Sequence, residues 1–127
     1  MDYKGQGRSN YFKVKEPSEF RKWCREVGIK YACRGGRQFS VSATDDGDLP
    51  DTHPETGEDL NALEEILDRM ADGQTLVWFH TGSEGMRYMN GCALALHKGK
   101  ETMIVDLGTI YQLIQKQGWP LQSRAAY

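Results

Sequence analysis

The chain has 127 residues, of which 39% are hydrophobic, and a formal net charge of −2. This length fits a single domain over 1–127, which should fold without disulfides or a structural metal. No apolar run approaches the roughly 18 residues of a membrane span, and no secretory h-region opens the chain, so we expect a cytoplasmic protein that does not contact membranes. Three separated cysteines without a CxxC pair indicate reduced thiols, and we expect neither a metal nor a cofactor.

Charge is distributed unevenly along the chain. Residues 1–37 have a balance of +6, residues 38–86 a balance of −11, and residues 87–127 a balance of +3. Such blocks polarise the molecular surface only where folding keeps them apart. The acidic middle and the basic N-terminal third are therefore the two candidate binding surfaces.

The first half of the chain predicts a strand, a helix and a hairpin. Residues 1–8 are Gly-rich and expected to be mobile, whereas the β-forming side chains of Asn10–Lys15 predict a strand. A helix should begin at Pro17 and end at Gly28. Its apolar residues share one face: Phe20, Trp23, Cys24 and Val27. Two strands, Ile29–Cys33 and Gln38–Thr44, then flank the Gly-containing turn at 34–37.

The second half begins with an acidic loop over 45–57, where two prolines disfavour regular structure. A weak capping box at 56–59 predicts a helix over 58–72 with a core stripe of Leu60, Leu63, Leu67 and Met70. Three strands follow, at Thr75–His80, Arg87–His97 and Glu101–Val105. Asp106 should cap a third helix that carries Leu107, Ile110, Tyr111 and Ile114, and residues 119–127 form a tail.

The resulting order, β-α-β-β-α-β-β-β-α, predicts an α+β protein with a mainly antiparallel sheet and helices packed on it. Its first six elements match the ferredoxin-like βαββαβ pattern. The final hairpin and helix are expected to extend that sheet. The strand order and the choice between a monomer and a homodimer stay open.

The acidic middle offers a candidate protein-binding face on the loop and on the polar side of the helix that follows. An EF-hand needs acids at alternate positions and Gly at the sixth, and this loop fails that spacing, although binding of a cation is left open. A solvated loop is the competing interpretation. The predicted binding residues are Asp45, Asp46, Asp48, Asp51, Glu55, Glu64, Glu65 and Asp68.

The basic N-terminal third supports an alternative function, binding of nucleic acid by an α+β module. Tyr11, Phe12, Tyr31 and Phe39 are the aromatics that would stack on bases. The sequence RGGRQFSVSA lacks the register of an RNA-recognition motif, and the isoelectric point near 5.9 is low for such a domain. The residues of this alternative are Lys13, Lys15, Arg21, Arg25, Arg34 and Arg37.

Catalysis has weaker support, and we predict no catalytic residues. His80 and His97 are expected at the ends of separate strands, and Cys92 and His97 should face opposite sides of one strand. No phosphate loop or nucleophile elbow occurs. A cryptic enzymatic site at His80, Cys92 or His97 is the second alternative.

The stretch RSNYFKVK at 8–15, the helix with Phe20 and Trp23, and the later RYMNG at 87–91 resemble small accessory proteins of phages and conjugative elements. That resemblance implies a stoichiometric inhibitor of a host protein or defence complex, as anti-CRISPR and anti-restriction proteins are. An acidic patch suits this role because it competes for basic grooves that hold nucleic acid. The leading hypothesis is a non-enzymatic, anti-defence protein that binds its partner through the acidic face.

Overall fold

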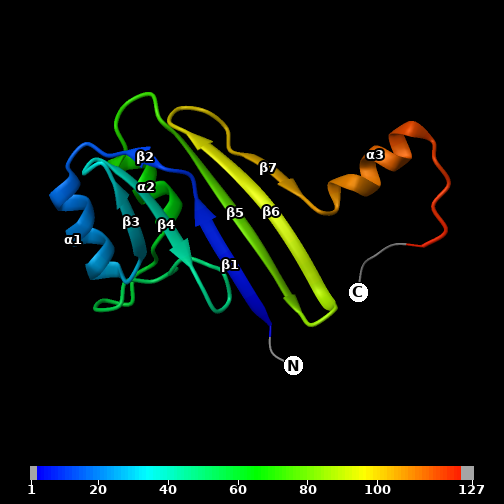
Figure 1. Cartoon of the computed structure of the whole chain (residues 1–127), viewed down its shortest axis with the longest axis horizontal. Helices are drawn as coiled ribbons and strands as arrows, with labels where there is room; N and C mark the ends of the chain where they lie inside the picture. Colours follow the sequence, from blue (N-terminus) through cyan, green and yellow to red (C-terminus); the bar gives the residue numbers. More distant parts are fainter. Residues whose placement is uncertain (1–2, 124–127) are drawn as a thin grey trace.

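The computed structural model describes residues 3–123, which form one antiparallel sheet with helices (Figure 1). None of the helices in this part of the chain is long and apolar enough to cross a membrane. The elements, in chain order, are β1 Lys4–Ser9, β2 Phe12–Lys13, α1 Pro17–Val27, β3 Lys30–Arg34, β4 Gln38–Ala43, α2 Ala62–Arg69, β5 Thr75–Glu84, β6 Arg87–His97, β7 Met103–Asp106 and α3 Thr109–Gln117.

The sheet runs β2-β4-β1-β5-β6-β7, and β3 also pairs with β4. All strand pairs are antiparallel. Strand β4 therefore lies between β1 and β3, the strands on either side of α1, which is a split β-α-β arrangement. The predicted α+β class is confirmed, and β6, β7 and α3 continue the sheet past β5.

Helix α1 has the bounds that its sequence predicts, because its apolar face and both of its ends are encoded locally. Pro17 is at its start, and Gly28 ends it with φ 82°, a conformation that glycine adopts without steric cost. The four stripe residues are all buried. Phe20 lies at the centre of an aromatic cluster, with ring centroids 5.8 Å from Phe12 and 5.0 Å from Phe39.

Helix α2 is shorter than the predicted helix over 58–72. The capping box at 56–59 is not used, and the side chain of Asn61 instead accepts a hydrogen bond from the Glu64 amide. The chain before it stays extended, because Asp59 bridges to Thr52. After it, Met70 is extended and bridges to Val14, yet its side chain is buried as the stripe predicts.

Two strand predictions are wrong. Residues 4–9, expected to be mobile, form β1 in the middle of the sheet, paired with both β4 and β5. Strand β5 continues beyond His80 to Glu84, so the predicted turn at 82–85 lies mostly inside a strand. Glycines explain the first error: a Cβ on Gly7 would clash with the Trp78 ring and the Gly47 carbonyl oxygen. Close packing there favours residues that look like a linker in the sequence.

The C-terminal elements extend away from the core. Figure 1 shows α3 beyond β7, past the edge of the sheet that is far from α1 and α2. The N-cap of α3 is Gly108, and not Asp106 as the sequence predicts; Asp106 ends β7, and its side chain accepts a hydrogen bond from the Thr109 amide. No residue of α3 is buried, and all four residues of β7 are exposed. Residues 124–127 of the predicted tail lie outside the described residues.

Candidate functional site

The acidic loop is fastened to the sheet by close backbone contacts. The Gly5 amide donates to the Asp45 carbonyl oxygen at 2.7 Å, and Gly5 also bridges to Asp46. A Cβ on Gly47 would lie 2.7 Å from the Gln6 nitrogen and 2.8 Å from the His80 ring. Glycine at 5 and 47 therefore allows the loop to cross β1 directly, which fixes where the carboxylates emerge.

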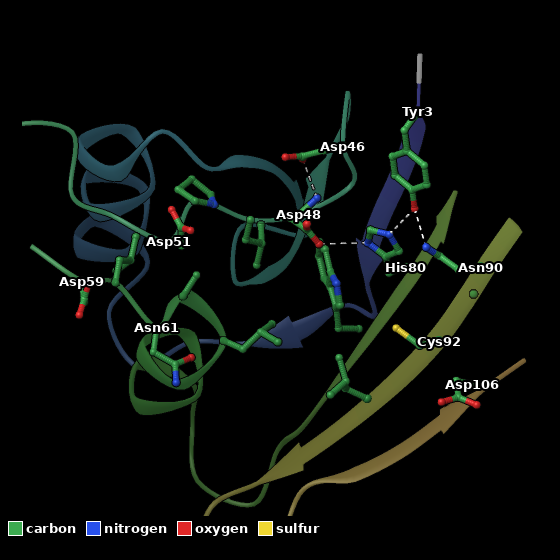
Figure 2. Close-up of a pocket in the computed structure, with 18 residues that line it drawn as sticks. Tyr3, Asp46, Asp48, Asp51, Asp59, Asn61, His80, Asn90, Cys92 and Asp106 are labelled. Carbon is green, nitrogen blue, oxygen red and sulfur yellow. Dashed lines mark hydrogen bonds and ion pairs between the residues drawn. The ribbon is translucent and has the colours of Figure 1, made fainter. Parts of the chain in front are cut away.

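A hydrogen-bonded chain of side chains lies beside this crossing (Figure 2). Nδ1 of buried His80 is 3.0 Å from the Gly47 carbonyl oxygen and 3.2 Å from Oδ1 of Asp48. A carbonyl only accepts, so Nδ1 donates to it, and Nε2 is hydrogen-bonded to the Tyr3 hydroxyl at 3.1 Å. Asn90 Nδ2 in turn donates to that hydroxyl at 2.8 Å. Nδ1 therefore holds the acidic loop against β5, and Nε2 connects the ring to Tyr3 beside β1.

A pocket of about 1020 Å³ opens next to this chain, between the acidic loop, the start of α2 and strands β5 to β7. Figure 2 shows Asp51 and Asp59 across the pocket from Cys92 and Asp106. Five carboxylates line it: Asp46, Asp48, Asp51, Asp59 and Asp106. Leu60, Trp78 and Leu94 add apolar surface. The pocket thus combines negative charge with an apolar lining.

The predicted binding face divides into two groups of residues. Asp46, Asp48 and Asp51 line the pocket, and Asp45 lies beside it with φ 68°. The second group comprises Glu55 in the outer loop and the acids of α2, of which Glu64 and Asp68 are exposed. Glu65 is half-buried, and its carboxylate oxygens lie 3.7 Å from Nη1 of Arg69 and 4.0 Å from Nε2 of His53.

Most of these carboxylates have no counter-charge. Within residues 3–123, no cationic side chain pairs with Asp46, Asp51, Asp59 or Glu64. The same part of the chain holds no group of three or more His, Cys, Asp or Glu side chains that could bind a metal ion. The pocket therefore presents unneutralised charge to a mobile or protein-bound cation, and its oxygens do not converge on one point.

Tyr3, His80, Asn90 and Cys92 meet at the pocket, and sequence reasoning did not bring them together. His80 and Cys92 are direct cross-strand partners of β5 and β6. The two His80 nitrogens contact the Gly47 carbonyl oxygen and the Tyr3 hydroxyl, and on its other side Cys92 pairs with Asp106 of β7. His97 contacts the Thr75 hydroxyl at 3.0 Å, and the alternation of β6 places it on the other face from Cys92.

The basic residues of the alternative function lie on or next to β2, α1 and β3. Arg34 stacks over Tyr11 at 4.1 Å, and Arg21 over Phe39 at 5.2 Å. Phe12 and Phe39 are 1% and 0% exposed, so neither ring is open to a base. Lys13, Lys15, Arg25 and Arg37 are exposed.

Comparison of the chain with protein-family models, curated proteins and solved structures gave no match.

Proposed function

We propose that this protein acts by binding a basic surface of another protein, without catalysis, through the acidic pocket and the loop that forms its wall. The observation that carries this proposal is the set of pocket carboxylates around an apolar lining, of which Asp46, Asp51 and Asp59 have no cationic partner among the described residues. A Lys or Arg side chain matches that combination, because its aliphatic stem packs on apolar surface while its charged end meets carboxylates. Several such side chains on one partner would engage the pocket and the loop together.

The partner class that we propose is a host protein with a groove for nucleic acid, such as a defence nuclease. Two features support it: the resemblance of residues 8–15 to accessory proteins of mobile elements, and the location of the charge on one local face. An acidic face competes with phosphates for the same cations. The protein would then work as a stoichiometric, cytoplasmic inhibitor. The nucleic-acid-binding alternative stays a prediction with fewer exposed aromatics than its sequence suggested.

The test compares two variants of equal charge in a capture experiment from nuclease-treated host lysate. The site variant replaces Asp45, Asp46, Asp48 and Asp51 by Asn, which preserves shape and tolerates the positive φ at 45. The control variant replaces four exposed glutamates outside the pocket, Glu16, Glu19, Glu26 and Glu101, by Gln. We expect the site variant to lose the captured protein at least tenfold relative to wild type and control, since each lost charge pair contributes about 1 kcal/mol or more.

Two further readouts make the result decisive. Alkylation of Cys92, which lines the pocket, should slow when the captured protein is bound. Plating of phage on defence-proficient cells that express the protein should improve with wild type and control only. Equal capture by all three proteins would refute the acidic face as the binding surface. Capture that disappears after nuclease treatment would favour the nucleic-acid alternative.

A further inference from the structure

The exposed large hydrophobic side chains are confined to one end of the molecule. In the part of the chain that the structure describes, all twelve lie between residues 79 and 121. Their exposed fractions run from 44% to 76%. They are Phe79, Met86, Tyr88, Met89, Met103, Ile104, Val105, Leu107, Ile110, Leu113, Trp119 and Leu121. Soluble monomers rarely leave so many large apolar side chains open at one end, which points to a partner.

Part of this surface lies on the face of the sheet opposite the pocket, along a strip that we call the β6 channel because its central strand carries only small side chains. The face follows from alternation: Trp78 and His80 line the pocket, so Val77 and Phe79 point the other way. Pairing and one amide hydrogen bond define three rows across β5, β6 and the β7 end: Val77–Ala95–Met103, Phe79–Ala93–Val105 and Thr81–Gly91–Leu107. The middle column holds only Ala and Gly, between two columns of larger side chains, and the Leu107 side chain lies over its Gly91 end.

Within residues 3–123, helix α3 leaves the apolar side chains of Ile110 and Leu113 exposed. Ile110, Leu113 and Ile114 fall at helical spacing on one side, yet no residue of the helix is buried. An isolated helix of nine residues is marginal in water, and burial of an apolar face is what usually stabilises one. The opposite side carries Gln112 and Gln115. This helix therefore requires an apolar surface to pack against.

We propose that two copies of the chain form a symmetric dimer in which α3 of each copy packs into the β6 channel of the other. The chain's own channel is out of reach, because the Leu107 amide is still bonded to Gly91 and Gly108 alone separates Leu107 from α3. In Figure 1 the helix accordingly continues outward past β7. In this exchange each copy buries its own α3 and its own channel, so the dimer contains two identical contacts related by a two-fold axis.

Area and polarity agree with a second copy as the occupant. A large side chain that is half to three-quarters exposed leaves on the order of 100 Å² open. The exposed ones on the channel and on the apolar side of α3 therefore give about 600 Å² per partner, the lower end of stable interfaces. They are Phe79, Met103, Val105, Leu107, Ile110 and Leu113. The channel rows and the apolar side of α3 contain no charged residue. The pocket lies on the other face of the sheet, so both pockets of the dimer stay open to the partner proposed above.

The first test is the mass of the full chain in solution, measured by analytical ultracentrifugation over a wide range of concentrations. We expect wild type to have twice the mass of one chain. Ile110→Glu with Leu113→Glu, and separately Ala93→Glu, should raise the dissociation constant at least about tenfold, because each buries an unpaired charge. The matched controls should remain dimeric: Gln112→Glu with Gln115→Glu on the other side of α3, and Gln6→Glu on the same sheet face outside the channel.

Mixing the two dissociated variants tests the pairing itself. The helix variant keeps an intact channel and the Ala93→Glu variant keeps an intact α3, so one of the two contacts can form in a heterodimer. We expect the mixture to contain heterodimer at concentrations where either variant alone is monomeric. A monomeric wild type, dimers that resist both variants, or a mixture without heterodimer would each overturn the proposal. The Asp-to-Asn site variant should dimerise normally, so failure of either proposal is distinguishable from failure of the other.

Discussion

The two ends of this molecule use hydrophobic residues in opposite ways. Between residues 3 and 78, the large apolar side chains pack into one cluster around Phe20 and Phe39. Between residues 79 and 121, twelve side chains of the same kind are exposed, although the strands there pair just as regularly. Backbone pairing therefore continues past the point where side-chain packing stops.

The difference has a topological cause. Helices α1 and α2 follow strands of the split β-α-β part and return across one face of it, whereas α3 follows the edge strand β7 and leaves the sheet (Figure 1). A face that no helix covers stays open even when its sequence is apolar. The first region thus accounts for the stability of the single chain, and the second is available for contacts with other chains.

The largest expected contrast comes from the same substitution made in both regions. Leu76→Ala removes a side chain that is 0% exposed and should cost about 2–5 kcal/mol of unfolding free energy at every protein concentration. Leu113→Ala, on α3, should change the stability of dilute protein by less than about 0.5 kcal/mol. Urea unfolding followed by circular dichroism at several protein concentrations measures both.

Assembly through α3 adds a second expectation to this pair. The effect of Leu113→Ala should grow with protein concentration, since it acts only through the associated state. The effect of Leu76→Ala should not depend on concentration. Equal costs for the two variants in dilute solution would contradict the division of the molecule into a packed region and an open one.

A smaller contrast comes from two sheet glycines. A Cβ on Gly7 would clash with Trp78 and the Gly47 carbonyl, so Gly7→Ala should destabilise the fold by roughly 1–3 kcal/mol and displace the acidic loop. On Gly91 the nearest atom would be 3.5 Å away, an ordinary contact with Leu107, so Gly91→Ala should cost less than about 0.5 kcal/mol. Thermal unfolding of dilute protein measures both. A well-tolerated Gly7→Ala would mean that the loop does not cross β1 as closely as the structure has it.

Sequence reasoning succeeded where the signal is local. The spacing of Phe20, Trp23, Cys24 and Val27 and the αL glycine after them define α1 without reference to any other segment. The β3–β4 hairpin is also local, because its turn residues and the alternation of Phe39 and Val41 lie within one short stretch. The α+β class follows from the order of such local elements.

It failed where a segment is defined by distant neighbours. Strand β1 contains no large apolar residue, and its burial comes from glycines that lie against Trp78 and the 45–47 loop. The meeting of His80 with Cys92 depends on the register of β5 and β6, and the register depends on a turn at 85–86 rather than 82–85. Continuing the alternation of β5 past His80 would have found that pair.

Part of the candidate site could be predicted from the sequence for the same reason. Composition alone identified the loop carboxylates as an exposed acidic face, and their role in binding stays a prediction. Tyr3 and Asn90 join the site through hydrogen bonds that span 77 and 87 residues of sequence. No pattern within a strand or helix indicates contacts of that range, so the pocket could not be assembled from the sequence.

The smallest expected effect concerns the thiols. Burial raises the pKa of Cys24 from 9.0 to about 12, although Arg69 and Arg25 oppose that shift. An unfolded chain therefore loses this proton near pH 9 and the folded chain near pH 12, so stability should decline as pH rises through that window. At pH 8 a disulfide reagent should label a variant that retains only exposed Cys33 rapidly. A variant that retains only Cys24 should react at the rate of unfolding. Replacement of Cys24 by Val should remove this residue's share of the loss of stability at alkaline pH. Equal labelling rates for the two single-thiol variants would show that the packed region opens far more readily than its burial implies.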